Sequence, residues 1–296
     1  MDIRGKLWRL KRYLQHYFSG EIVINGYFAF NGKQLINNNF GDDINFPLLY
    51  ALTKKPIVYY YHVGLRRIDN LLCIGSIIEF CDNNSIIWGS GAMFGDRDLT
   101  YKPQKVCAVR GHYTKRYLEE QGINCPDVYG DPALLMPYFY NPIVKKKYKV
   151  GIIPHYVDYN LPHVERFRET HPDTLFVCLQ GYSSWKDVVC QIKSCERIIS
   201  SSLHGLIISD AYGIPNIRVK FSDAISGGDF KYKDYYSGIG REYYDAIDFT
   251  GNIDLSIISS LFDDYVPINY NPKKLLLSFP YPSKLTLEVK KIIMEC

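Results

Sequence analysis

The chain has 296 residues, of which 47% are hydrophobic and 22% are charged, and its formal net charge is +4. This length is sufficient for two hydrophobic cores, and so small a charge excludes a dedicated nucleic-acid binder. No apolar run approaches the roughly 18 residues of a membrane-spanning helix, and the N-terminus lacks the apolar core of a signal peptide. The eight Cys are scattered without a CxxC pair, so we expect reduced thiols, no metal site and a cytoplasmic protein.

Residues 1–20 form a basic amphipathic segment that differs from the rest of the chain. Its first 18 residues, MDIRGKLWRLKRYLQHYF, mix Arg and Lys with Leu, Trp, Tyr and Phe. Such a helix could pack its apolar side on the protein body, or it could lie on an anionic membrane surface. Both interpretations stay open at this point.

Apolar runs typical of strands alternate with helical patterns along most of the chain. This alternation predicts an α/β protein with parallel, doubly wound sheets, in which ligands bind at the carboxyl ends of the strands. The polar, proline-containing stretch 141–149 marks a domain boundary. We expect two Rossmann-like domains, residues 21–142 and residues 148–296, with a central cleft. The last helix is expected to pack back on the first domain. The predicted strands are 22–30, 71–74, 86–88, 106–110, 149–153, 174–178, 197–200 and 216–219, and the predicted helices are 43–52, 113–121, 185–194 and 206–212.

The motif NNNFGDDIN, residues 37–45, lies between a predicted strand and a predicted helix. One of its carboxylates could cap that helix. Capping does not explain two adjacent carboxylates, so Asp42 and Asp43 are candidates for a general base. Together with Asn39 and Asn45, these side chains could instead hold a sugar hydroxyl.

Two further motifs follow strands of the first domain. The sequence WGSG, residues 88–91, is a glycine-rich turn, and its Ser90 is a candidate for ligand binding. Arg110 falls at the end of the predicted strand 106–110, where a guanidinium could hold a carboxylate or phosphate through two hydrogen bonds. A surface salt bridge is the alternative role for Arg110.

In the second domain, the sequence SSSLHG, residues 200–205, ends a predicted strand and begins a helix. The N–H groups at a helix start carry partial positive charge and favour an anion. Ser201, Ser202 and Gly205 could therefore approach a phosphate, and His204 could add positive charge or a proton. The alternative is a cluster of capping serines beside a structural histidine.

Two other segments of the second domain carry candidate residues. His155 follows the predicted strand 149–153 and is a second candidate for an acid or a base. Gly227 and Gly228 predict a mobile loop ahead of Lys231. This loop could close on an anion or a sugar, or it could be a simple connection.

In this order, the motifs resemble those of the polysaccharide pyruvyl transferase family. The resemblance covers roughly residues 25–241. It implies a two-domain fold similar to that of GT-B type glycosyltransferases, and transfer of a pyruvyl group from phosphoenolpyruvate to a sugar of a bacterial surface polysaccharide. The implied products are a pyruvate ketal and phosphate. The matching motifs are NFGDDIN, IGSII, WGSG, VRGHYTKRYLEEQGI, YGDPALLMP, GIIPHY, ISSSLHGLIISDAYGIP and GGDFKYKDYY.

The resemblance also implies a phosphoenolpyruvate site made of an arginine, a histidine in a Leu-His motif and a downstream lysine. Arg110 and His204 match the first two. Ser202 stands where many members have another arginine, and Lys220 and Lys231 are both candidates for the lysine. We therefore expect Arg110 and His204 to meet around the donor.

We expect the reaction to be divided between the domains, with the donor on the second and the acceptor on the first, where it would be bound by Asn39, Asp42, Asn45 and Ser90. Asp42 or Asp43 would take the proton of an acceptor hydroxyl from the domain opposite His204, and His155 is the alternative acid or base. No metal and no cofactor besides the donor phosphoenolpyruvate is expected, because cationic side chains balance its charge. The family's acceptors include lipid-linked sugars, which supports the membrane-surface interpretation of residues 1–18, at the inner face of the cell membrane, while packing on the protein body stays the alternative.

Two other functions stay open. A GT-B type glycosyltransferase with a nucleotide-sugar donor would share the architecture, but residues 174–213 show no Glu or Arg/Lys pair placed to hold a diphosphate. A non-catalytic carbohydrate-binding protein would explain the 26 Tyr, but it has no use for cationic residues at strand ends.

Overall fold

The structure, a computed structural model, describes residues 3–32, 34–65, 67–251, 253, 255–258, 260–263 and 265–295. The chain forms two compact units that interleave along the sequence. Unit 1 comprises residues 1–27, 45–132 and 271–296, and unit 2 comprises residues 28–44 and 133–270. The segment 28–44 therefore packs with the second half of the chain, although the predicted boundary near residue 142 had assigned it to the first domain.

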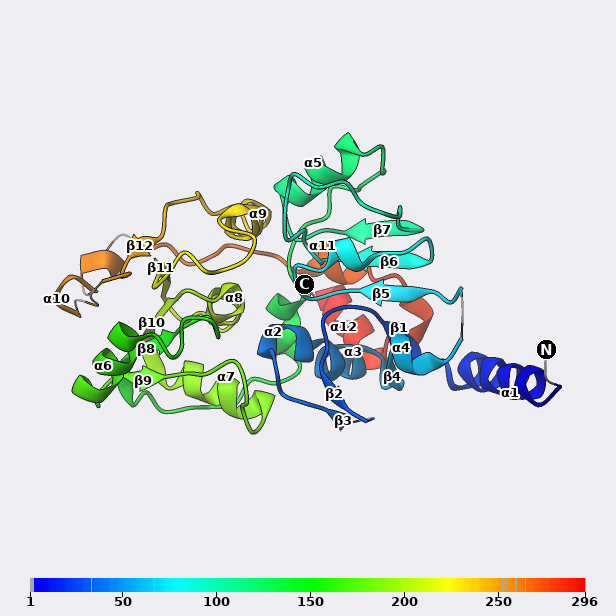
Figure 1. The fold of residues 1–296 in the computed structure, drawn as a ribbon, viewed down its shortest axis with the longest axis horizontal. Helices are drawn as coiled ribbons and strands as arrows, with labels where there is room; N and C mark the ends of the chain where they lie inside the picture. The colour runs from blue at the N-terminus through cyan, green and yellow to red at the C-terminus, as the bar shows by residue number, and fades with distance from the viewer. Residues whose placement is uncertain are drawn as a thin grey trace. The chain divides into compact units, whose positions relative to one another are not determined.

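Unit 1 contains a parallel sheet of five strands in the order β4-β1-β5-β6-β7 (Figure 1). These strands are β1 (Ile22–Ile24), β4 (Ile57–Tyr59), β5 (Asn70–Leu72), β6 (Ser85–Trp88) and β7 (Lys105–Ala108). All residues of β1, β5 and β6 are buried, which is typical of parallel strands covered on both faces. The described helices of unit 1 are α1 (Ile3–Ser19), α3 (Asn45–Thr53), α4 (Tyr60–Val63), η1 (Ile78–Phe80), α5 (His112–Glu120), α11 (Lys273–Leu277), η4 (Pro282–Lys284) and α12 (Leu287–Glu295).

The C-terminal segment is attached to unit 1 through a buried tryptophan. Trp88, at the end of β6, donates from Nε1 to the Leu275 carbonyl at 3.0 Å. Its ring meets the edge of the Phe279 ring, with the centroids 4.9 Å apart. The indole thus combines a large apolar contact with a satisfied polar group, which anchors α11 to the sheet.

Unit 2 contains a second sheet of five strands, in the order β12-β11-β10-β8-β9 (Figure 1). The paired strands run parallel. They are β8 (Tyr148–Ile153), β9 (Leu175–Phe176), β10 (Cys195–Ser200), β11 (Asn216–Lys220) and β12 (Ile247–Asp248). The described helices are α2 (Phe40–Asp43), α6 (Pro162–Thr170), α7 (Trp185–Lys193), α8 (Leu203–Ala211), α9 (Phe230–Gly238), α10 (Leu255–Ile258) and η3 (Ser260–Phe262), with η2 (Pro132–Tyr138) leading into the unit and an antiparallel pair, β2 (Phe30–Asn31) and β3 (Gln34–Leu35).

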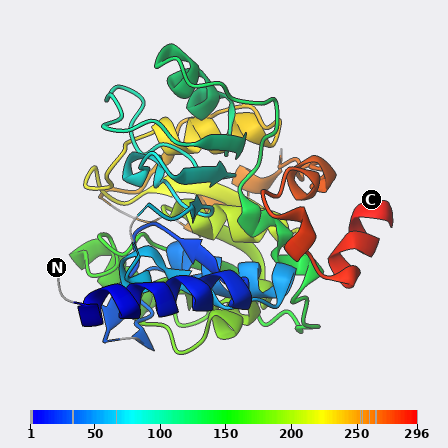
Figure 2. The same ribbon diagram turned by 90° about the vertical axis from the view of Figure 1, so that its right-hand side faces the viewer.

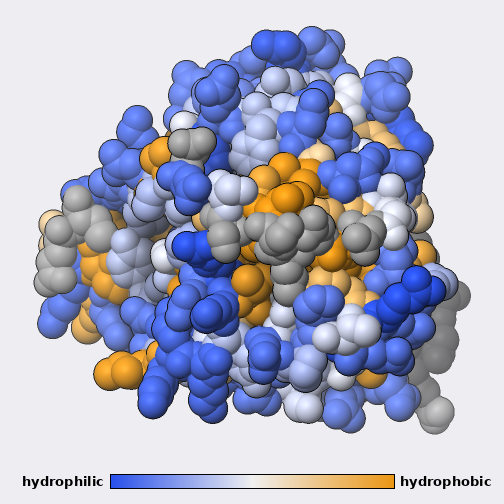
Figure 3. All heavy atoms as spheres, turned by 90° about the vertical axis from the view of Figure 1, so that its left-hand side faces the viewer, coloured by the Kyte–Doolittle hydropathy of each residue, from blue (hydrophilic) through white to orange (hydrophobic). Residues whose placement is uncertain are grey.

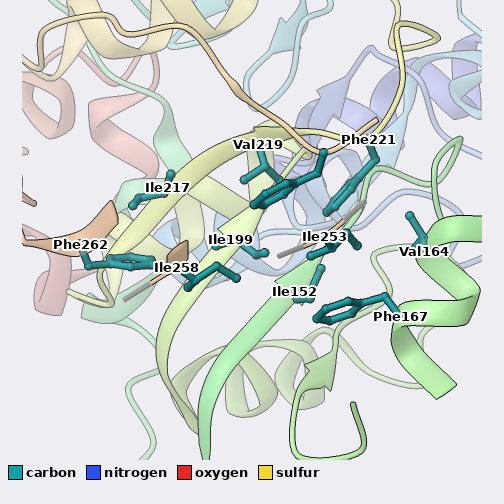
Figure 4. Close-up of a cluster of buried hydrophobic side chains, with 11 residues drawn as sticks. Ile152, Val164, Phe167, Ile199, Ile217, Val219, Phe221, Ile253, Ile258 and Phe262 are labelled. Carbon is teal, nitrogen blue, oxygen red and sulfur yellow. The ribbon is translucent and has the colours of Figure 1, made fainter. Parts of the chain in front are cut away.

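One hydrophobic cluster in the core of unit 2 lies between its sheet and α6. Side chains of β8, β10 and β11 cluster there with those of α6 (Figure 4). Each fully buried aliphatic or aromatic side chain contributes about 1.5–3 kcal/mol to folding. The buried cluster comprises Ile152, Val164, Phe167, Ile199, Ile217, Val219, Phe221, Phe249, Ile253, Ile258 and Phe262.

The surface of unit 2 on the outer side of α6 and α10 is mostly hydrophilic, with hydrophobic residues near the middle of the face (Figure 3).

The two parallel sheets confirm the predicted α/β class, whereas the likeness to GT-B enzymes and the central cleft stay predictions. Each predicted strand overlaps an observed one, but the predicted strand 22–30 is wrong beyond Ile24. The chain turns at Gly26, which has a φ of 156°, and it pairs again only at Phe30. The predicted helix 43–52 is divided, because Asp43 ends α2 and α3 begins at Asn45. No helix within the described ranges is both long and apolar enough to cross a bilayer.

Gly205 lets α8 begin directly against the ends of β8 and β10. A Cβ at this position would lie 2.3 Å from Ser200 Oγ and 3.0 Å from Ile153 Cγ2. Both neighbours are buried in the sheet, so neither can move away at low cost. The glycine therefore determines how closely the helix N-terminus approaches the strand ends.

We predict that Gly205→Ala lowers the free energy of unfolding by about 1–3 kcal/mol, because the added methyl group overpacks the helix start. Without the clash, alanine in a helix would stabilise by up to about 1 kcal/mol, so the sign of the change is informative. Urea denaturation measures it. Gly251→Ala is the matched control, since that position has open space and no positive φ, and it should change stability by less than about 0.5 kcal/mol. Equal effects of the two substitutions would contradict the close approach.

Candidate functional site

The carboxyl ends of the unit 2 strands gather polar side chains around one buried carboxylate. His155 follows β8, and its backbone N–H donates to Ser201 Oγ, just after β10, at 2.8 Å. Ser201 Oγ in turn donates to Asp158 Oδ2 at 2.7 Å, and the hydroxyl of Ser222 donates to Asp158 Oδ1. Asp158 and Ser201 are buried. Ser201 therefore has an internal role, in which it fixes the loop that carries His155.

The helix α8 begins at this edge without a side-chain cap. Ser202 is its N-cap residue, and the Ser202 side chain makes no capping hydrogen bond. Instead, Ser200 Oγ accepts from the Ser202 N–H at 3.0 Å and donates to the Ile153 carbonyl at 2.8 Å. The capping-cluster interpretation is thus wrong for the Ser202 hydroxyl, and His204 is placed as the second residue of the helix.

The helix α2 packs against His204. A Cβ on Gly41 would lie only 2.0 Å from His204 Nδ1, so the α2 backbone rests directly on the imidazole. Only glycine permits this approach, because any other side chain would occupy the space of the ring. The segment is held in unit 2 by a hydrogen bond from the Phe40 N–H to the Leu179 carbonyl at 2.9 Å. The Asn37 side chain adds a second one, to the Tyr182 carbonyl at 2.6 Å.

The Asp43 carboxyl is buried beside this contact, with 4% of the residue exposed. Its Oδ2 accepts from the Tyr182 hydroxyl at 2.7 Å and from the Asn39 N–H at 3.2 Å. Its Oδ1 is buried and has no hydrogen-bond partner in the part of the chain that the structure describes. Burial raises the pKa of Asp43 to about 6, against the opposing effect of these hydrogen bonds. Such a carboxyl can exchange a proton in either direction near neutral pH.

Asp42 and Asn39 form a second polar pair on the same turn. The Asn39 amide donates to Asp42 Oδ2 at 2.5 Å. Asn39 is the N-cap residue of α2 and makes no side-chain capping bond, so its amide orients the carboxylate of Asp42 instead. Both adjacent carboxylates are thereby buried and oriented, which capping alone would not require.

His155 and the two candidate lysines have distinct electrostatic situations. Burial, followed by the nearby positive charge of Lys231, lowers the pKa of His155 to about 3. Its imidazole is therefore neutral at physiological pH and a weak base. Lys231 lies in α9, where it is buried and donates to the Ser226 carbonyl at 3.1 Å. Lys220 ends β11 on the surface, and its Nζ lies 3.1 Å from Asp223 and 3.3 Å from Asp248.

Arg110 lies in unit 1, with none of its surface exposed. Its Nη1 donates to Ser76 Oγ at 2.6 Å and its Nη2 to the Ala92 carbonyl at 3.0 Å. A Cβ on Gly91 would lie 2.2 Å from the guanidinium carbon, so the glycine-rich turn closes directly over it. The surface salt bridge considered for Arg110 is therefore excluded by burial. The guanidinium joins two loops at the carboxyl ends of β5 and β6.

The two other unit 1 candidates are enclosed as well. Asn45 pairs with the backbone of Ile74, donating from Nδ2 to its carbonyl at 3.0 Å and accepting its N–H at 2.8 Å. The Asn45 amide thus pairs with the backbone beyond the end of β5 as a neighbouring strand would, which is a structural role. Ser90 is buried, and its Oγ has no hydrogen-bond partner among the described residues.

The contacts thus bring together part of the predicted site. Asp42, Asp43 and His204 share unit 2, contrary to the expectation that the carboxylates act from the domain opposite the histidine. The meeting of Arg110 with His204 around one donor stays a prediction. Sequence reasoning did not find Tyr182, because its bond to Asp43 joins residues 139 positions apart.

Unit 2 also has a cavity that lies apart from these residues. The cavity, of about 600 Å³, opens at the start of β11, at the other end of the strand from Lys220. It is lined mainly by aliphatic and tyrosine side chains, and none of the predicted site residues is among its described lining. Within the residues that the structure describes, no three His, Cys, Asp or Glu side chains gather closely enough to hold a metal ion.

Comparison with known proteins agrees with the order of the motifs. The family model described as polysaccharide pyruvyl transferase matches residues 6–222. An uncharacterized protein of Acanthamoeba polyphaga mimivirus is 33% identical over 213 residues, which are 70% of this chain and 73% of that protein. The succinoglycan biosynthesis protein ExoV of Rhizobium meliloti (strain 1021) is 26% identical over 225 residues, 70% of this chain and 63% of that protein. Because the family model matches more than half of the 296 residues, the chain belongs to the polysaccharide pyruvyl transferase family.

Proposed function

We propose that this protein transfers the enolpyruvyl group of phosphoenolpyruvate to a sugar of a polysaccharide or of its lipid-linked precursor. The products are a pyruvate ketal and phosphate. Membership of the family supports pyruvyl transfer, and a relative named for succinoglycan biosynthesis supports a polysaccharide acceptor. The observation that carries the residue assignment is the contact of Gly41 with the His204 imidazole, which brings a helix with two carboxyl groups to the start of α8.

The donor carries a phosphate and a carboxylate on three carbons, so its site needs several convergent positive groups. The N-terminus of α8 offers backbone N–H groups, and His204 adds a donor in its first turn. Lys231 is the preferred lysine, since it is buried near His155, whereas Lys220 is engaged by two surface carboxylates. Arg110 is the candidate that the family resemblance supplies from unit 1. Its enclosure by Gly91 and Ser76 favours a positioning role.

The proposed reaction begins with a proton delivered to the methylene carbon of the donor, which leaves an oxocarbenium-like centre at the next carbon. A sugar hydroxyl oxygen bonds to that centre and loses its proton to a base. A second hydroxyl of the sugar then replaces phosphate, which leaves with the bridging oxygen and takes up the second hydroxyl's proton. One proton given by the acid and one taken by the base balance the cycle.

We assign the base to Asp43 and the acid to His204. Asp43 has a pKa of about 6, so it is largely ionised at neutral pH and its Oδ1 can accept a proton. His204 lies against the same helix and at the N-terminus of α8. His155 is a poor alternative for either role, because its pKa of about 3 leaves it neutral and weakly basic. Asp42, held by Asn39, is positioned to bind an acceptor hydroxyl.

The direct test is incubation with phosphoenolpyruvate and a panel of lipid-linked and aryl galactosides and mannosaminides. We expect phosphate release that depends on an acceptor, and a gain in acceptor mass of about 70 Da, roughly pyruvic acid less water. His204→Gln should lower the rate by about 100- to 10,000-fold. Consumption of a nucleotide sugar in place of phosphoenolpyruvate would indicate a glycosyltransferase and contradict the proposal.

The assignment of Asp43 also predicts a pH dependence. As a base, Asp43 must be ionised, so kcat/KM should rise with pH through about 6. Asp43→Asn should abolish this rise in the pH profile of kcat/KM, which we call the acidic limb, and lower kcat/KM by about 100- to 10,000-fold. Tyr182→Phe deletes a hydrogen bond to the carboxylate, so the pKa of Asp43 should increase and the limb should move to higher pH.

The matched control for the tyrosine is Tyr60→Phe. Tyr60 also donates to a carboxylate, Asp82, at 2.8 Å, but it lies in unit 1. Its replacement should leave the pH profile unchanged. A limb near pH 6 that persists in Asp43→Asn would assign the titration to another group.

A further inference from the structure

The helix α1 is docked on unit 1 through its polar side. Arg12 donates from Nε to the Val63 carbonyl at 3.0 Å and from Nη2 to Glu21 Oε1 at 2.5 Å. His16, one turn later, has its Nδ1 2.8 Å from the same carboxylate oxygen. A Cβ on Gly64 would lie 2.6 Å from the Trp8 ring, so the edge of this ring contacts the unit, although 54% of Trp8 is exposed.

These contacts define the face of α1 that is turned toward the protein. Trp8, Arg12 and His16 are spaced four residues apart, so they lie on one side of the helix. The helix runs along the outside of unit 1, next to α4 (Figures 1 and 2). A helix that packs on a water-soluble body normally turns its apolar side inward, and α1 does the reverse.

The opposite side of α1 is an apolar stripe exposed to solvent. Its residues follow the spacing of one helix face, and their exposed fractions lie between 45% and 79%. A contiguous group of large exposed apolar side chains usually marks a site that binds another protein or a membrane. The apolar stripe comprises Leu7 at 61%, Leu10 at 58%, Leu14 at 45%, Tyr17 at 73% and Phe18 at 79%.

The charge of α1 selects among the surfaces that could cover the stripe. The segment Ile3–Ser19 contains five Arg or Lys and no Asp or Glu. A second copy of the helix would bring like charges together, which is unfavourable. An anionic membrane offers an apolar layer for the stripe and negative head groups for the exposed side chains of Arg9 and Lys11.

We propose that α1 lies in the surface of an anionic membrane, with the apolar stripe at the boundary of the acyl chains and its basic residues among the lipid head groups. The helix lies along the surface and does not cross it. This contact does not depend on the proposed reaction, because it uses α1 in unit 1, whereas the assigned acid and base lie in unit 2. Loss of membrane binding and loss of pyruvyl transfer can therefore be measured separately.

The test is co-sedimentation of the full chain with vesicles of phosphatidylcholine alone or of phosphatidylcholine mixed equally with phosphatidylserine. We expect binding to the mixed vesicles that weakens as salt is added. The variant with Leu10→Glu and Leu14→Glu should reduce the partition coefficient by about tenfold or more. The variant with Arg9→Glu and Lys11→Glu should lower it by at least about fivefold for each charge. Ile143→Glu, at an exposed apolar residue of unit 2, is the matched control and should change nothing.

Three results would overturn the proposal. One is failure of the wild-type chain to bind the mixed vesicles. Another is binding that neither pair of substitutions changes. The third is a dimer in analytical ultracentrifugation that Leu10→Ser dissociates, since the apolar stripe would then be covered by a second copy. The substituted side chains are exposed, and an unchanged thermal midpoint verifies that each variant is folded.

Discussion

The contact between the α2 backbone and the His204 imidazole is the constraint on which the candidate site depends. It requires glycine at position 41, because a Cβ would lie 2.0 Å from the ring. It also requires the segment 28–44 to leave the first part of the chain and to pack in unit 2. Asp42 and Asp43 belong to this segment, so one close packing contact brings the two residues of the proposed acid–base pair, Asp43 and His204, together from distant parts of the sequence.

Burial then gives the titratable groups of unit 2 different properties. The same desolvation that raises the pKa of Asp43 to about 6 lowers that of His155 to about 3, because burial always disfavours the charged form. A carboxyl near neutrality suits proton transfer, whereas a neutral imidazole suits hydrogen bonding. The network of Ser201 and Asp158 holds His155 in place and supports this structural interpretation.

Much of the fold could be predicted from the sequence, because buried parallel strands are continuous apolar runs with polar ends. Two of the elements that were not predicted have local causes. β4 is a half-buried strand of three residues, too short to show a period, and α9 is rich in aromatic and charged residues without a clear apolar face. In the site, glycine turns and strand-end polar residues pointed to Asp43 and His204. The partner Tyr182 could not be predicted, since only tertiary packing joins it to Asp43. The unit to which residues 28–44 belong likewise depends on long-range contacts such as that of Phe40 with Leu179.

A double-mutant cycle between positions 41 and 204 tests the central contact most directly. In the wild-type background, Gly41→Ala should lower the free energy of unfolding by about 1–3 kcal/mol, because the methyl group collides with the imidazole. In the His204→Gly background the ring is gone, and the same substitution should be neutral or slightly stabilising, as alanine is in a helix. An equal loss in both backgrounds, measured by urea denaturation, would contradict the contact and with it the assembly of the proposed site.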